Sequence, residues 1–133
     1  MQHDPMRPAI TLGGTEHRRL LTLAMIGSGH TADDSDYLNH ELDRARIVPD
    51  EQLPPDVVRI GSTVTYRTDD NVRTATIVYP EQADLAAGKI SVLSPVGAAL
   101  LGLRPGQSIT RMGWDGDFRT LFVLAVRPPV ALQ

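Results

Sequence analysis

The chain has 133 residues, of which 41% are apolar and 22% charged, values that exclude a disordered or fibrous protein and suit one small domain. Its net charge of −3 disfavours a direct, sequence-independent grip on DNA or RNA, which needs a basic surface, and favours a protein partner. Because it lacks cysteine, an apolar run of ~20 residues and a signal-peptide pattern, we expect a cytoplasmic protein that makes no contact with a membrane.

The first half predicts a flexible lead-in and two helices. Residues 1–14 contain two prolines and a Gly-Gly pair, so we expect a loosely tethered segment. Thr15 is placed to cap a first helix, which the glycines at 27–29 end. A second helix should start near residues 33–35 and end by Val48, because proline follows.

The two helices should pair as a short antiparallel hairpin over residues 15–48, similar to a coiled coil. The apolar spacings of three and four place one stripe on each helix. We expect these leucines to face one another and to form a satellite core of their own: Leu20, Leu23, Leu38 and Leu42.

The second half predicts a sheet. Residues 49–56 hold three prolines and should be an extended, stiff linker that marks a domain boundary. Beyond it, β-branched runs broken by turn signals predict an antiparallel sheet over 57–133, with strands near 57–60, 62–68, 72–79, 89–93, 107–112 and 118–126. The fold class is therefore α+β.

A short helix interrupts the strands. Ser94 can cap it with its side-chain oxygen, and Pro95 suits its first position because a missing N–H costs nothing there. Gly102 supplies a stop just past Leu101. We expect Gly97 to allow close packing, because its spacing from the neighbouring glycines is not that of a phosphate-binding loop.

The chain resembles the Rnk-type regulators of nucleoside diphosphate kinase, which are relatives of the Gre transcript cleavage factors. The resemblance runs from about residue 36 to the last strand. It is carried by NHELDRARIV at 39–48, PDEQLPPDVVRIGSTVTYR at 49–67, IVYPEQAD at 77–84 and above all SVLSPVGAALLGLRPGQSI at 91–109. It implies an FKBP-like fold for residues 57–133.

The resemblance also implies a partner. In the Gre relatives the corresponding Ser-Pro turn helps to dock on RNA polymerase at the mouth of the secondary channel, so Ser94, Pro95 and Val96 are the candidate partner-binding residues. Helix capping alone also explains Ser94 and Pro95, and both roles are compatible. We expect a monomeric, non-enzymatic transcription regulator that binds core polymerase and competes with Gre factors.

Cleavage stimulation is not expected. The Gre hairpin is much longer and carries carboxylates that help to hold a metal in the polymerase active site, whereas the predicted helices of about eleven and thirteen residues project only ~16 to 20 Å. Asp33, Asp34 and Asp36 lie near the hairpin turn, but they do not match the Gre tip motif, and acidic residues are favoured at any helix N-terminus.

Other sites are less favoured. The histidines are scattered, and the nearest cluster, His30 with Asp33, Asp34 and His40, lacks the ligand pattern of a zinc site, so we expect no metal and no cofactor. Trp114 in a WDGD turn is a candidate exposed contact. Two alternative functions stay open: regulation of nucleoside diphosphate kinase through another partner, and prolyl isomerisation, for which the aromatic content of 5% is low.

Overall fold

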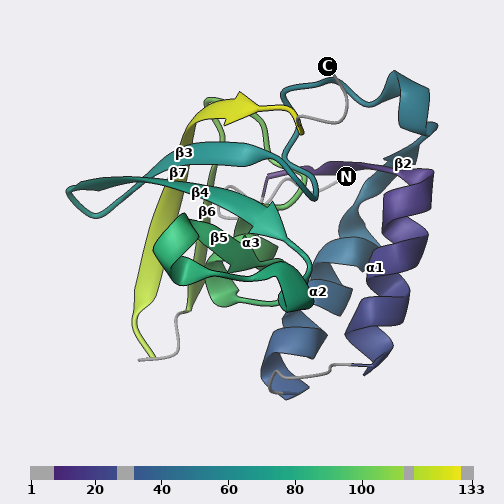
Figure 1. Ribbon diagram of the computed structural model, residues 1–133, viewed down its shortest axis with the longest axis horizontal. Coiled ribbons are helices and arrows are strands. Elements are labelled where there is room, and N and C mark those ends of the chain that lie inside the picture. The colour runs from purple at the N-terminus through teal and green to yellow at the C-terminus, as the bar shows by residue number, and fades with distance from the viewer. Residues whose placement is uncertain (1–7, 27–31, 113–115, 130–133) are drawn as a thin grey trace.

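The protein consists of a helical hairpin packed beside a five-stranded sheet, as the computed structural model shows (Figure 1). The structure describes residues 8–26, 32–112 and 116–129. Helices α1 (Gly14–Ile26) and α2 (Ala32–Arg44) run antiparallel beside each other, and the sheet follows in the chain. The predicted α+β class, with a hairpin before the sheet, is confirmed.

The main sheet is mixed. Its strand order is β5-β4-β3-β7-β6, with bounds β3 (Thr63–Thr68), β4 (Asn71–Val78), β5 (Lys89–Ser91), β6 (Ser108–Met112) and β7 (Phe118–Arg127). β5 pairs with β4 in parallel, in the register Ile77 with Ile90, whereas the other pairs are antiparallel. The expectation of a wholly antiparallel sheet is therefore wrong at this edge.

The N-terminal segment is not a loose lead-in over its described part. Strand β1 (Thr11–Gly13) pairs in parallel with β2 (Arg46–Val48), and Ile10 and Leu12 are buried. The burial of these two side chains explains why the segment is structured, since burying an isoleucine or leucine side chain stabilises the fold by ~1.5 to 3 kcal/mol. The second helix, expected to end by Val48, ends at Arg44, because residues 46–48 form strand β2 and pair with β1.

The region predicted as a linker is folded back and not extended. Residues Asp50–Gln52 form a short 3₁₀ helix, η1, and the Asp50 carboxylate accepts a hydrogen bond from the Thr15 amide at 3.0 Å. Thr15 is thus inside α1, and Asp50 supplies the acceptor that we expected from Thr15 itself. Residues 57–60 form no strand, although Val57 and Val58 are fully buried.

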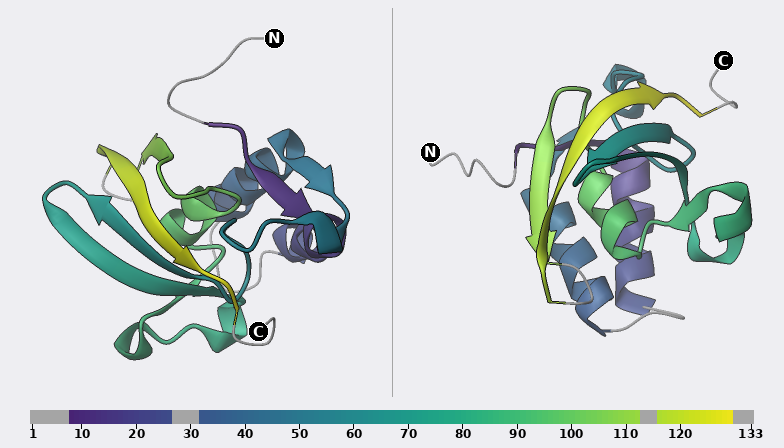
Figure 2. Two further views of the ribbon diagram at one scale, coloured as in Figure 1. Left: turned by 90° about the horizontal axis from the view of Figure 1, so that it is seen from above. Right: turned by 90° about the vertical axis from the view of Figure 1, so that its left-hand side faces the viewer.

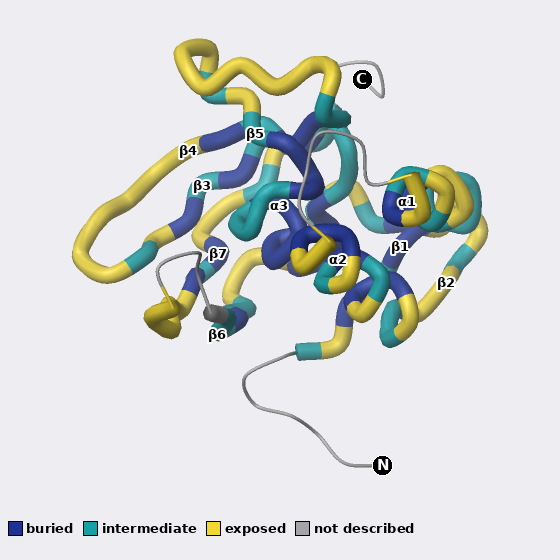
Figure 3. Tube along the Cα trace, turned by 90° about the horizontal axis from the view of Figure 1, so that it is seen from below, coloured by how far each residue is buried: buried dark blue, intermediate teal, exposed yellow. Residues whose placement is uncertain are grey.

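One hydrophobic core joins the hairpin to the sheet. Leu20, Leu38 and Leu42 are at most 1% exposed and belong to the same cluster as Val64 and Val123 of the sheet, with Leu23 packed at its margin. The expected satellite core is therefore wrong, and no separate hairpin core divides the chain. Helix α3 (Pro95–Leu100) contributes its last three residues to this cluster, and Figure 3 shows the later part of its tube as dark blue next to α2.

Two further 3₁₀ turns, η2 (Pro80–Gln82) and η3 (Leu85–Ala87), form a lobe beside β5 (Figure 2). Within the described part of the chain, every helix is too short or too polar to cross a membrane.

Candidate functional site

Ser94 begins α3 with two hydrogen bonds from one side-chain oxygen. Its Oγ accepts from the Gly97 amide at 3.1 Å and donates to the Ser91 carbonyl oxygen at 2.6 Å. Pro95 occupies the first helical position, and Leu101 ends the helix before Gly102, whose φ is +80°. The predicted cap, first residue and stop of this helix are all confirmed.

Gly97 allows the helix to lie directly on the backbone that precedes it. A Cβ atom at this position would come within 2.1 Å of the Ser91 carbonyl oxygen. Such a contact is impossible without movement of the main chain, so any other residue would displace the start of α3. The expectation that this glycine serves close packing is confirmed.

The candidate residues form one contiguous surface turn. Ser94, Pro95 and Val96 are all half-buried, and Val96 packs against the main core. Ser94 and Pro95 are therefore partly exposed, while the contacts of Ser94 with the Ser91 carbonyl and of Val96 with the core fix the turn. A rigid turn of this kind can contact a partner at little cost in conformational entropy, and its role in binding stays a prediction.

Arg111 on β6 supports the turn from the side. Its Nη1 donates a hydrogen bond to the Pro95 carbonyl oxygen at 2.8 Å, and its guanidinium carbon lies 3.7 Å from the centroid of the Tyr37 ring on α2. Burial lowers the pKa of Arg111, an effect opposed by Tyr37 and by the carboxylates of Asp34 and Glu41. This residue connects the hairpin to the candidate turn.

We did not predict Arg111 from the sequence, although two signals were available. Residues two apart on a strand share a face, so Arg111 falls on the same side as the buried Ile109. On α2, Glu41 follows Leu38 by three residues and is 0% exposed, which places an acid within the apolar stripe. Charged residues at inward positions of both elements indicate a buried polar contact between them.

The three acidic residues at the start of α2 differ in their surroundings. Asp33 and Asp36 are exposed, whereas Asp34 is 4% exposed and lies where its carboxylate acts on Arg111. The acids therefore do not present one cluster to solvent. Among the described residues, no group of three His, Asp or Glu side chains is placed to hold a metal ion. His30 and Trp114 lie outside the described residues.

Aromatic side chains do not converge on one apolar pocket in the described part of the chain. Tyr66 is buried in the core, Tyr79 is half-buried after β4, and Phe118 is 69% exposed on β7. Phe122 lines a surface hollow with Phe118, but Arg67, Asp69 and Arg119 line it too. This lining does not favour the holding of a proline ring.

Comparisons with known proteins agree on one family. The family model of the transcription elongation factor GreA/GreB C-terminal domain matches residues 53–128. The regulator of nucleoside diphosphate kinase of Escherichia coli K12 is 41% identical over 105 residues, which are 77% of each chain. The elongation factor GreA of Chloroflexus aggregans is 45% identical over 92 residues, which are 68% of this chain and 58% of that protein.

A solved structure has the same architecture. The transcription elongation factor GreA/GreB of Nitrosomonas europaea superposes with a TM-score of 0.70 at 35% identity, over 91% of this chain and 99% of that one. These relatives are named as regulators or elongation factors and not as catalysts. The resemblance drawn from the sequence is confirmed, and the chain belongs to the GreA/GreB C-terminal domain family as a Gre-related regulator similar to the regulators of nucleoside diphosphate kinase.

Proposed function

We propose that the protein is a non-enzymatic, monomeric regulator in the cytoplasm that binds RNA polymerase near its secondary channel and competes with Gre factors. The observation that carries this proposal is the 94–96 turn. In it Ser94 caps the start of the helix, and hydrogen bonds to the Ser91 carbonyl and from Arg111 to the Pro95 carbonyl fix the backbone. Family membership supports polymerase as the partner.

The length of the hairpin argues against transcript cleavage. Both α1 and α2 have 13 residues, which corresponds to roughly 20 Å each. The match to the elongation factor GreA of Chloroflexus aggregans spans 58% of that protein. We infer that this hairpin ends in the outer channel, too far from the catalytic metal for a tip carboxylate to act.

Binding is tested by retention of core polymerase on the immobilised protein. The variant Ser94→Ala with Pro95→Ala should fold, since loss of one cap costs ~1 kcal/mol, and should retain much less polymerase. Pro80→Ala is the matched control, because Pro80 also stands at the start of a short helix, η2, away from the turn. Equal retention by a folded double variant and the control would refute docking through this turn.

Cleavage is tested with a backtracked elongation complex. The protein should inhibit cleavage that a Gre factor stimulates and should stimulate none by itself. Asp33→Asn with Asp36→Asn removes the exposed acids at the start of α2 without touching the buried Asp34, and should change neither result. Stimulation by the parent chain that this variant loses would overturn the length argument.

The name of the Escherichia coli relative supports a second candidate function, regulation of nucleoside diphosphate kinase. Purified protein added to the purified kinase should then change its rate directly. If the rate changes only in cells, and only with an intact 94–96 turn, the effect on the kinase passes through transcription.

A further inference from the structure

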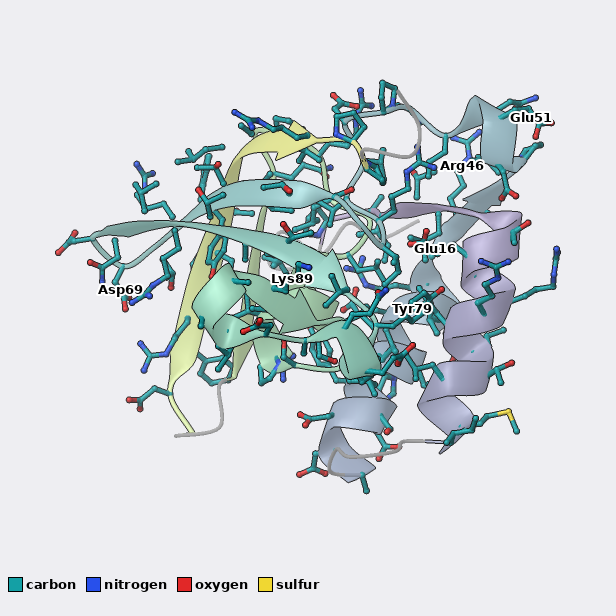
Figure 4. The ribbon with its side chains drawn as sticks, viewed as in Figure 1. Glu16, Arg46, Glu51, Asp69, Tyr79 and Lys89 are labelled. Atoms are coloured by element: carbon teal, nitrogen blue, oxygen red, sulfur yellow. The ribbon has the colours of Figure 1, made fainter. Side chains whose placement is uncertain are left out.

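A cavity of about 310 Å³ lies where the hairpin meets the sheet, at the N-terminal end of α1. It is lined by side chains from α1, from η1, from the loop before β3 and from the residue after β4. Figure 4 shows Glu16 and Tyr79 in this junction between α1 and the sheet. Its polar lining residues are Thr15, Glu16, Arg19, Asp50, Arg59 and Tyr79.

Two arginines bring positive charge to the cavity. The Nε atom of Arg59 is buried and has no hydrogen-bond acceptor among the described residues. This nitrogen is out of reach of a ligand, but Arg59 lines the cavity, so its other guanidinium nitrogens could donate to an oxygen atom bound there. Arg19 on α1 lines the same cavity and is a hydrogen-bond partner of the Tyr79 side chain.

The two acidic groups of the cavity already accept hydrogen bonds from backbone amides. Glu16 Oε1 accepts a hydrogen bond from the Ile60 amide at 2.9 Å, and Asp50 Oδ1 accepts from the Thr15 amide. Both carboxylates thus bind the backbone, and the side chains of Arg19 and Arg59 line the same cavity. The lining therefore favours an acceptor ligand over a cation.

We propose that this cavity is a binding site for a small oxyanion, either a phosphate-like or a carboxylate group, held between the guanidinium groups of Arg19 and Arg59. Guanidinium groups are the preferred protein partners of such anions, because their parallel N–H donors match the oxygen atoms. The Tyr79 hydroxyl would contribute a further donor. A bound anion would connect α1 to the loop before β3, and so the hairpin to the sheet.

Binding should depend on pH through Glu16. The pKa of Glu16 is raised to about 7, chiefly by burial and also by Asp50, against the lowering effects of the Ile60 amide, Arg59 and Arg19. Tyr79 faces the same carboxyl from the end of β4. When Glu16 is protonated, two guanidinium groups face a single carboxylate, that of Asp50. When it ionises, the charges of the lining balance and the attraction for an anion is lost.

The test is an NMR titration of the whole chain with sodium sulfate at constant ionic strength, followed at the amides of Gly13 and Ile60. Sulfate keeps its charge between pH 6 and pH 8, so a change in affinity reports on the protein. If the bound state requires protonated Glu16, affinity should fall about tenfold between these pH values. Acetate replaces sulfate in a second arm and distinguishes a carboxylate ligand from a phosphate-like one.

Three variants make the result specific. Arg59→Gln should abolish saturable shifts, whereas Arg67→Gln, the same change at an exposed arginine of β3 outside the cavity lining, should bind as the parent does. Glu16→Gln keeps an acceptor for the Ile60 amide and should bind with no dependence on pH. Shifts that do not saturate with either anion, equal affinities of the Arg59→Gln and Arg67→Gln variants, or tighter binding at pH 8 would each overturn the proposal.

Discussion

Arg111 donates a hydrogen bond to the carbonyl oxygen of Pro95 across 2.8 Å, while the same guanidinium covers the ring of Tyr37 on α2. The Pro95 carbonyl belongs to the first turn of α3, so the contact with Arg111 fixes the orientation of the start of this helix. The hairpin and the candidate binding turn therefore share one side chain, and a change at this residue should be felt at both.

Arg111→Gln should destabilise the protein by about 1.5 to 3 kcal/mol, the usual worth of a hydrogen bond from a charged group, and should speed hydrogen exchange at the Gly97 amide. Urea unfolding and exchange NMR measure the two effects. Arg67→Gln is the control, because Arg67 is exposed and lies 5.3 Å above the Phe122 ring, a contact worth ~0.5 to 1 kcal/mol. Equal losses in both variants, with unchanged exchange at Gly97, would contradict the shared role.

Glu16 should make stability depend on pH. Its pKa is about 7 in the folded chain against an ordinary 4.5, so between these values the folded state keeps a proton that the unfolded state releases. Stability should therefore fall as pH rises from 4.5 to 7, by about 2 to 3 kcal/mol in total. The depressed pKa of Asp50 acts in a lower window, since its contribution is lost only as pH falls below 3.8.

Glu16→Gln isolates this effect. The amide oxygen can still accept from the Ile60 amide, but it carries no charge, so the variant should be more stable than the parent at pH 8 and similar at pH 4.5. Urea unfolding across this range is the measurement. A parent and variant with parallel curves would show that the burial of this carboxyl is not felt in stability.

Leu42→Asp should unfold the whole protein, because Leu42 lies in the core that α2 shares with the sheet. A buried unpaired carboxylate in place of leucine costs more than ~4 kcal/mol, a large part of the stability of a small domain. Circular dichroism of the helices and amide exchange of β3 should report one coincident loss. Leu85→Asp, at an 83% exposed position of η3, should change little. Loss of helical signal with a protected β3 would restore the separate hairpin domain.

Gly102→Ala should be more damaging than Gly106→Ala. Both glycines have positive φ, +80° and +89°, so both variants carry the same backbone strain of ~1 kcal/mol. At Gly102, however, the added Cβ would lie 2.7 Å from the Cβ of Ile10, whereas nothing stands within 4 Å at Gly106. The difference in unfolding free energy measures how tightly the N-terminal segment packs on α3. Equal losses would mean that Ile10 moves freely.

The elements that the sequence predicts well are those whose signals are local. Ser94, Pro95 and Gly102 each act on residues within one turn, and so the bounds of α3 follow from them. Strand β2 depends instead on the pairing of Ile47 with Leu12, which is far away in the chain, and the residues next to Ile47 do not predict a strand. The parallel direction of β5 is likewise a property of its neighbour and not of its own side chains.

The candidate site follows the same division. The 94–96 turn could be predicted because a short motif carries it. Arg111 and the cavity at Glu16 could not, since each is made by residues from three or four elements that meet only in the folded chain. The available signals, charges at inward positions of β6 and α2, indicate a buried contact without naming its partner.

The parallel pair of β1 and β2 holds both ends of the hairpin side by side, in the register Thr11 with Arg46. The hairpin thus begins and ends at one place in the fold. At its other end, beyond the buried Ala24, α1 carries exposed residues such as Met25. An insertion of equal length in both helices at that end would add ~1.5 Å of reach per residue and leave this base untouched. The hairpin is thus an adjustable part: its length can be changed by insertion while the proposed binding turn at 94–96 stays as it is.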